Sequence, residues 1–263
     1  MKLPFFGRKP SSSAQTTPSP PAGDGNGEAH PGHRAVLDHL RRTEGEQPLA
    51  RPQLVGRLLF DMICKIVANG GRGVRIEDLL AILASTGGFS CLVAALSEVD
   101  RSPLDGTSLA IVTGKDGHHY FFGDLPNRYL IESEFALLSL ALGAARAFGG
   151  SVSLDMVHQT MRHVAGTVVG GEGFGQPQLT AEHRPGDLPF NYVRFLWPRV
   201  LEGLKLYEVP PTQAPVAIGF ALQRAIEAGK DAIDPTLAAR IAIECAVPMA
   251  KVDPKRIASP EAS

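Results

Sequence analysis

The stretch that decides the fold runs from Leu79 to Ser97 and reads LLAILASTGGFSCLVAALS. It carries no charged residue, and its length reaches that of a helix that spans a membrane. However, small polar and flexible residues interrupt its centre between Ser85 and Ser90, and the charges on its flanks show no positive bias. We therefore expect two short buried helices joined by a turn, with a membrane span as the alternative.

Residues 79–98 also have the outline of a helix-turn-helix, with Ala84 in the first helix and Gly88 in the turn. A recognition helix places Arg, Lys, Asn or Gln at base edges, and the second half of this stretch contains none of them. Over all 263 residues, 26 Lys and Arg stand against 27 Asp and Glu, so no basic excess is present to neutralise phosphates. We expect no nucleic-acid partner.

Helical periodicity recurs on both sides of this stretch. The compact domain is expected to begin near Arg51, and an amphipathic helix with Leu54, Leu58, Met62 and Val67 on one face is expected to end at Asn69, Gly70 and Gly71. Further helices are expected at positions with start or stop signals, namely after the caps Ser133 and Ser153, from Pro215, and from Asp234 to a stop at Pro248. Residues 190–205 are also expected to be helical, with a strand as the alternative because NYVRFLW has strand propensity. In the helix after Ser153, the side chains expected to face inward are Leu154, Val157, Met161 and Val164.

The clearest strand signal lies at residues 107–122, where TSLAIVT and HHYFF flank the turn sequence GKDG. At least one of Gly114 and Gly117 is expected to take a positive φ. Together the patterns predict an α+β fold that is mainly helical, with several packed helices and one β-hairpin at about residues 107–122.

The first 50 residues differ from the rest in composition. Residues 10–33 are rich in Pro, Ser, Thr and Gly and carry no large apolar side chain, so we expect a disordered tail. A short polar helix is predicted within it at 34–47, and deletion of residues 1–45 is expected to leave the thermal midpoint unchanged. Residues 51–250 are predicted to form one globular domain, with two subdomains split near 150–185 as the alternative, and residues 251–263 a flexible C-terminus.

Residues 1–9 read MKLPFFGRK, which mixes apolar and basic side chains. They are expected to be an inert start, and contact with a membrane surface is the alternative. The three cysteines, Cys64, Cys91 and Cys245, lie far apart in apolar runs, and no CxxC pair is present. This pattern favours buried thiols in a reducing, cytoplasmic compartment and gives no reason to expect a metal site.

A four-residue sequence, Gly-Asp-Leu-Pro, occurs at 123–126 and again at 186–189, and Tyr129 and Tyr192 follow at the same offset. One interpretation is turn chemistry, in which Asp124 and Asp187 accept backbone N–H groups before a helix. The other is an internal duplication whose two carboxylates converge on one ligand.

A glycine-rich loop, VGGEGFGQP, spans residues 169–177. It lacks the GxGxxG spacing of a nucleotide-binding loop, and no helix is expected to follow it, so a mobile surface loop is the first interpretation. The alternative is a lid over a site in which Glu172 and His183 titrate. The candidate ligand-binding residues are Gly171, Glu172, Gly173, His183, Asp124, Asp187, Tyr129 and Tyr192, and no cofactor is predicted.

Because no nucleophile, P-loop or metal pattern stands out, the sequence favours a noncatalytic protein-interaction or regulatory protein, with another protein as its partner. The alternative is a small-molecule-binding protein or enzyme that uses the glycine-rich loop at 170–175 and its neighbouring Glu, His and Asp residues.

Overall fold

The structure is a computed structural model that describes residues 31–68, 73–99 and 108–258. The expected tail over residues 1–30, with its membrane-contacting segment at 1–9, and the last residues 259–263 lie outside the described residues. The helices are α1 (Pro31–Thr43), α2 (Ala50–Val67), α3 (Ile76–Val99), α4 (Asp124–Asn127), α5 (Leu137–Ala147), α6 (Leu154–Gly170), α7 (Pro189–Leu206), α8 (Ala214–Gly229), α9 (Pro235–Met249) and α10 (Pro254–Ala258). The strands are β1 (Ala110–Thr113) and β2 (His119–Phe122), and shorter helical turns occupy Arg128–Glu132, Ala181–His183 and Pro211–Gln213.

The stretch predicted to form two helices and a turn is one continuous helix, α3, so the helix-turn-helix outline is wrong. Two of the hydroxyl groups at its centre are satisfied within the helix, because Thr86 Oγ1 donates to the Ile82 carbonyl at 2.8 Å and Ser90 Oγ to the Gly87 carbonyl at 2.6 Å. α3 is long and apolar enough to cross a membrane, but 89% of its most apolar 18-residue window is buried inside the protein.

Gly87 and Gly88 lie inside α3 without breaking it, because neighbouring helices pack closely against both positions. A Cβ on Gly87 would lie 2.6 Å from Leu137 Cδ1, and a Cβ on Gly88 would overlap the carbonyl oxygen of Ala246. The two glycines therefore allow α5 and α9 to approach the α3 backbone, which offsets the low helix propensity of glycine.

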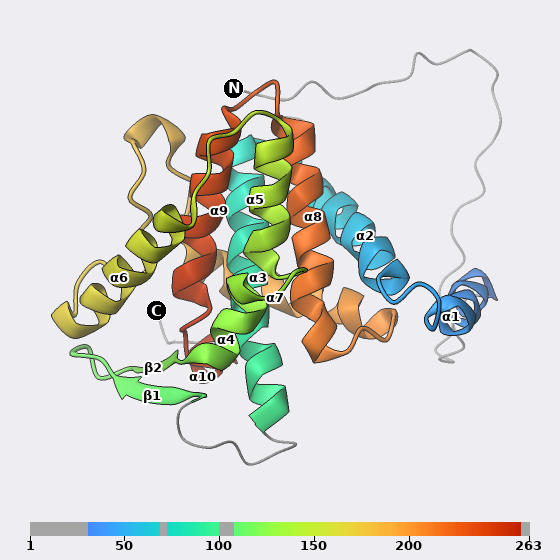
Figure 1. Cartoon of the computed structure of the whole chain (residues 1–263), viewed down its shortest axis with the longest axis horizontal. Coiled ribbons are helices and arrows are strands. Elements are labelled where there is room, and N and C mark those ends of the chain that lie inside the picture. Colours follow the sequence, from blue (N-terminus) through green and yellow to red (C-terminus); the bar gives the residue numbers. More distant parts are fainter. Residues whose placement is uncertain (1–30, 69–72, 100–107, 259–263) are drawn as a thin grey trace, which may run out of the picture.

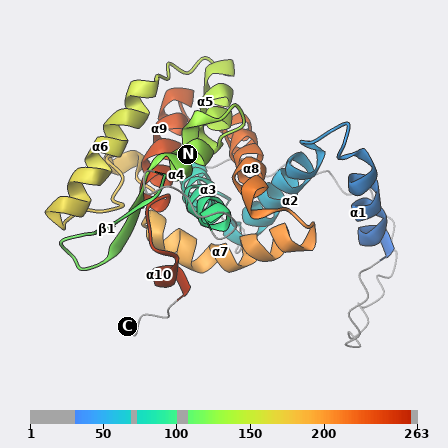
Figure 2. The same cartoon turned by 60° about the horizontal axis from the view of Figure 1, so that its bottom comes forward.

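α3 lies at the centre of the bundle, and α1 and α6 lie farther out (Figures 1 and 2). α7, α8 and α9 pack directly on α3, α5 packs on α8 and α9, α2 on α8, and α6 on α9. The β-hairpin lies at one end of this bundle, beside α4 and α10 (Figure 1). The prediction of a mainly helical α+β fold with one hairpin is confirmed for the described part of the chain.

The hairpin has the expected turn. β1 and β2 are antiparallel, with Ala110 opposite Phe122 and Thr113 opposite His119. Gly117 takes a φ of 79° in the turn between them. The other edge of β2 meets the C-terminal segment, because Tyr120 forms a bridge with Val252 and Phe121 N–H donates to the Lys251 carbonyl at 2.9 Å.

Most helix starts agree with the prediction, and the exceptions have physical reasons. Asp234 caps α9, since its carboxylate accepts the N–H groups of Thr236 and Leu237 at 2.8 and 3.1 Å, and these hydrogen bonds lower the pKa of Asp234. Ser133 does not cap α5, which begins four residues later at Leu137, and its carbonyl instead accepts Ser139 Oγ.

Three smaller details also differ. Ser153 stands at the N-cap of α6 but its side chain makes no capping bond. Leu154 was expected to face inward and is 52% exposed, because it lies in the first turn of α6, which extends beyond the core. Pro248 lies inside α9, which ends one residue later, so it does not stop the helix.

Both ends of the described chain pack on the bundle. The polar helix predicted at 34–47 is present as α1, and its Leu40 is 4% exposed. Packing therefore begins well before Arg51. At the other end, Lys251 and Val252 are buried and α10 follows, so residues 251–258 are not a loose terminus.

Candidate functional site

The structure places the second Gly-Asp-Leu-Pro copy against the N-terminal end of α3. Tyr192 O–H donates to Asp78 Oδ1 at 3.0 Å and accepts the Asp187 N–H at 3.0 Å. The Gly186 N–H also donates to Asp78 Oδ1, at 2.6 Å. Burial, followed by the negative charge of Asp78, raises the pKa of Tyr192 well above its ordinary value. This tyrosine stays protonated and acts as a hydrogen-bonding link between α7 and α3.

The Asp187 carboxylate accepts two hydrogen bonds at the start of α7. Its Oδ1 accepts the Leu188 N–H and the Asn191 side-chain amide, each at 2.7 Å. Asp187 therefore accepts a backbone N–H just before the helix, although it is not the N-cap residue, which is Leu188. At the other copy the capping interpretation does not hold, because α4 begins at Asp124 itself and the N-cap is Gly123, which has no side chain.

His183 lies in the same region but contacts a different carboxylate. Its Nδ1 is 3.4 Å from Glu77 Oε1, and Glu77 is only 5% exposed. Arg75 Nε lies 3.7 Å from the other oxygen of Glu77, and its Nη2 donates to the Arg184 carbonyl at 3.3 Å. Residues 183–187 are therefore attached to the first turn of α3 by both charge and backbone bonds.

The first Gly-Asp-Leu-Pro copy lies at the other end of α3. Tyr129, in the π-helical turn Arg128–Glu132, donates its O–H to Glu98, and Arg128 forms an ion pair with the same carboxylate. Burial and then Glu98 raise the pKa of Tyr129 to about 12. Each tyrosine thus binds an acidic residue near one end of α3.

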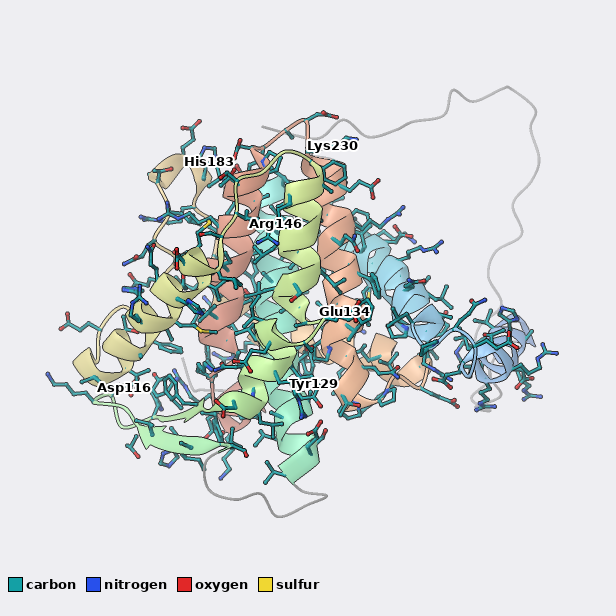
Figure 3. The ribbon with its side chains drawn as sticks, viewed as in Figure 1. Asp116, Tyr129, Glu134, Arg146, His183 and Lys230 are labelled. Carbon is teal, nitrogen blue, oxygen red and sulfur yellow. The ribbon has the colours of Figure 1, made fainter. Side chains whose placement is uncertain are left out.

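The two copies cannot share a ligand. Asp78 and Glu98 are 20 residues apart on one helix, which at a rise of 1.5 Å per residue is about 30 Å. Figure 3 shows His183 and Tyr129 toward opposite ends of the bundle. The hypothesis that the carboxylates of Asp124 and Asp187 converge is wrong, and both copies position α3.

The glycine-rich loop is anchored on the protein. Gly171 ends α6 with a φ of 82°, and Gly173 and Gly175 also have positive φ. The Phe174 ring lies 4.5 Å from the Tyr120 ring. Glu172 is exposed, and no described hydrogen bond or ion pair joins it to His183. The contact of Phe174 argues against a mobile loop. Because Glu172 and His183 are not joined, the structure does not support a lid in which these two residues titrate together.

Beyond this loop, α9 binds the backbone of Gln178 from both sides. The Gln178 N–H donates to Glu244 Oε2 at 3.2 Å, and the Gln178 carbonyl accepts a hydrogen bond from Arg240 Nη2 at 2.9 Å. Thr160 Oγ1 approaches the other oxygen of Glu244 at 3.4 Å. A small cavity of about 180 Å³ remains beside these residues, between α6 and α9.

A second cavity, of about 290 Å³, lies on the loop that contains Asp187. It is lined by Gln176, Pro177, Arg184, Pro185, Gly186, Asp187 and Leu188. His183 and Tyr192 do not line it, since their polar atoms face α3. In the described part of the chain, no three His, Cys, Asp or Glu side chains come together as a metal site would require.

Sequence reasoning missed the residues that pair with these candidates. Asp78 and Tyr192 are 114 residues apart, and Glu98 and Tyr129 are 31 apart, so no local pattern indicates either pair. Glu244 offered a signal, because it is a charged residue within the apolar sequence IAIECAV. Lys251 is buried as well, and its Nζ donates to Asn127 Oδ1 at 2.9 Å.

A further feature is the outer strand of the hairpin. All four residues of β1 are exposed, with Ile111 at 62% and Val112 at 38%. β1 pairs with β2 on one side, and no described strand pairs with its other edge, which faces outward in Figure 1.

Comparisons with protein-family models, with curated proteins and with solved structures gave no match for this chain.

Proposed function

We propose that this chain is a noncatalytic interaction protein that binds an extended segment of a partner protein along the free edge of β1. The observation that carries the proposal is the exposure of this strand. An unpaired edge presents a row of N–H and C=O groups, and proteins usually protect such an edge with charges, proline or a covering element. β1 reads AIVT and has neither a charge nor a proline.

The geometry favours an extended peptide segment as the partner. Ile111 and Val112 are successive residues of a strand, so their side chains point to opposite faces. An added strand would contact both of them with apolar side chains at adjacent positions, one on each face. Four residues of edge bury far less than the roughly 1,200 Å² of a stable interface between two globular surfaces, which disfavours a second copy of this chain docked through β1 alone.

The remaining candidates support a structural role more than a catalytic one. Tyr129, Tyr192 and Asp187 are all engaged in hydrogen bonds that hold α3 or begin α7. Among the described residues, these candidates place no nucleophile or general base beside a large cavity.

The test is a selection of displayed ten-residue peptides against the full chain. Selected peptides should carry apolar residues at adjacent positions, and Ile111→Lys and Val112→Lys should each weaken their binding by about tenfold or more. The matched control is Leu154→Lys, because Leu154 is 52% exposed and lies on α6. Peptides that bind all three variants as tightly as the parent would contradict the proposal.

A second candidate is the small-molecule binder that the sequence suggested. It is favoured by the cavity of about 290 Å³, whose lining includes Arg184 and Asp187. It ranks second because ligand pockets generally enclose about 300–1,000 Å³ and are mainly apolar. A metabolite that raises the thermal midpoint of the parent but not of Arg184→Gln would favour this candidate.

A further inference from the structure

The contact between α2 and α8 creates a groove that is lined by one arginine from each helix. The two helices lie alongside each other in both views (Figures 1 and 2). They meet at Gly56, where a Cβ would lie 2.6 Å from the Ala217 carbonyl oxygen and 2.7 Å from Phe220 Cβ. The backbones are therefore in direct contact at this point, and side chains one turn away on either helix are brought together.

The resulting groove has a volume of about 400 Å³ and is lined by Gln53, Arg57, Phe220, Gln223, Arg224 and Glu227. Arg57 and Arg224 are exposed, and each comes from a different helix. The Arg224 guanidinium lies 5.3 Å from the centre of the Phe60 ring, which orients it by a cation–π contact.

Neither arginine is neutralised by a nearby carboxylate. Within the described residues, no ion pair of 4.0 Å or less involves Arg57 or Arg224, although Glu227 lines the same groove. The groove therefore offers two guanidinium groups whose donors face solvent.

We propose that this groove binds an acidic peptide segment of a partner protein. Guanidinium groups bind carboxylates through paired hydrogen bonds, and the amides of Gln53 and Gln223 add further donors. From Phe220 to Glu227 the groove follows two turns of α8, about 10 Å. That length exceeds a single phosphate and suits successive carboxylates, while Phe220 can contact the methylene groups of glutamate side chains. Glu227 repels the ligand at one end and limits its position.

This site is separate from β1, so it goes beyond the proposed function and its variants test it independently. The probe is a fluorescein-labelled hexaglutamate peptide, followed by fluorescence anisotropy with the full chain at low ionic strength, where screening is weak. The double variant Arg57→Gln/Arg224→Gln should bind it about tenfold more weakly or worse. Glu227→Gln should bind it about two- to threefold more tightly, which a loss of folding cannot mimic.

The matched control is Arg34→Gln/Arg162→Gln, which removes the same charge from exposed positions on α1 and α6. It should leave binding within about twofold of the parent. An equal loss in this control would show attraction by overall charge and overturn the proposal, as would the absence of saturable binding to the parent. Binding of pyrophosphate, lost in the groove variant, without binding of hexaglutamate would assign the groove to phosphate instead.

Discussion

At the scale of single residues, Lys251 has the most unusual environment. It is 4% exposed, its ammonium group donates to Asn127, and it lies 5.4 Å from the centre of the Phe122 ring. Burial lowers its pKa to about 8, against roughly 10.4 for lysine in an unfolded chain. The folded protein therefore resists protonation of this side chain.

The consequence is a stability that depends on pH. Between pH 8 and about 10, the unfolded chain binds more protons at Lys251 than the folded chain, so this lysine adds a rise with pH to the free energy of unfolding. The thiols of Cys64, Cys91 and Cys245, whose pKa values burial raises, add a fall in the same range, so the rise due to Lys251 is the difference between the parent and a variant without it. Below pH 8 the lysine is charged in both states, so the folded state is destabilised by the full free energy of burying this charge. Lys251→Met should therefore raise the thermal midpoint at pH 7 and flatten the rise.

Thermal melts at several pH values between 7 and 10 measure this directly. The control is Lys205→Met, which removes an exposed lysine from α7 and should leave the pH profile of the parent unchanged. If Lys251→Met follows the same profile as the parent, the lysine is solvated and its pKa is ordinary.

At the scale of elements, α3 explains both where sequence patterns sufficed and where they did not. The periodic helices from Arg51, Pro215 and Asp234 were predictable, because their apolar stripes and end signals are local. α3 was not, because Gly87 and Gly88 look like a turn in sequence. Only the approach of α5 and α9 to these positions makes a continuous helix favourable.

This account predicts opposite effects for two glycine replacements. Gly88→Ala should lower the free energy of unfolding by about 1–3 kcal/mol or more, because the new methyl group overlaps the backbone of Ala246. Gly143→Ala, in α5, should raise it by about 0.5–1 kcal/mol, since no atom lies within 4 Å of its Cβ position. Urea unfolding of both variants gives the comparison. A neutral Gly88→Ala would mean that α3 and α9 are not in direct backbone contact.

The candidate site shows the same division between local and distant information. The position of Asp187 before a helix suggested that its carboxylate accepts a nearby backbone N–H, and its Oδ1 does accept the Leu188 N–H. The pairing of Tyr192 with Asp78 was not readable, because it depends on how α7 crosses the start of α3. Long-range hydrogen bonds of this kind follow from packing and leave no spacing pattern in a single sequence.

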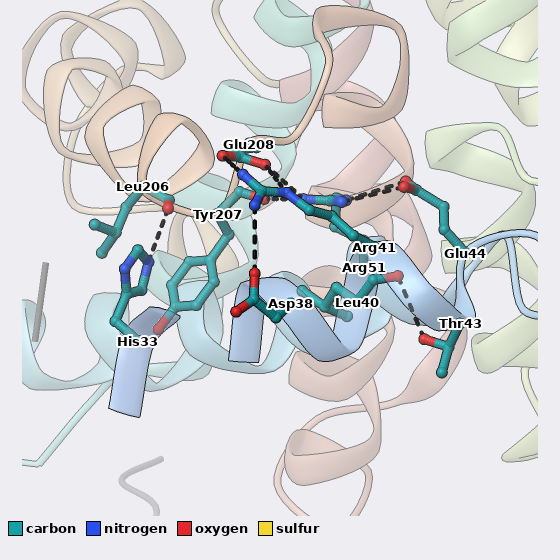
Figure 4. Close-up of polar contacts among 10 residues, drawn as sticks. All are labelled: His33, Asp38, Leu40, Arg41, Thr43, Glu44, Arg51, Leu206, Tyr207 and Glu208. Carbon is teal, nitrogen blue, oxygen red and sulfur yellow. Dashed lines mark hydrogen bonds and ion pairs between the residues drawn. The ribbon is translucent and has the colours of Figure 1, made fainter. Parts of the chain in front are cut away.

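At the scale of the whole molecule, α1 determines where the stable body begins. Arg41 forms an ion pair with Glu208, and His33 Nε2 is 2.9 Å from the Leu206 carbonyl oxygen (Figure 4). Glu44 pairs at 3.1 Å with Arg51, whose side chain is only 4% exposed. The sequence-based prediction that residues 1–45 can be deleted without effect is therefore revised.

Deletion of residues 1–45 should lower the thermal midpoint by several degrees. It removes the buried side chain of Leu40 and the ion pair to Glu208, and it leaves the guanidinium of Arg51 without Glu44 in a buried position. A loss of about 2 kcal/mol corresponds to roughly 4–8 °C for a chain of this size. Deletion of residues 1–30 alone should leave the midpoint within about one degree of the parent, because that segment has few apolar side chains to bury. Differential scanning calorimetry on the two truncations separates these outcomes. Equal midpoints for both truncations would show that α1 adds no stability, and an equal drop in both would place the stabilising contacts before Pro31.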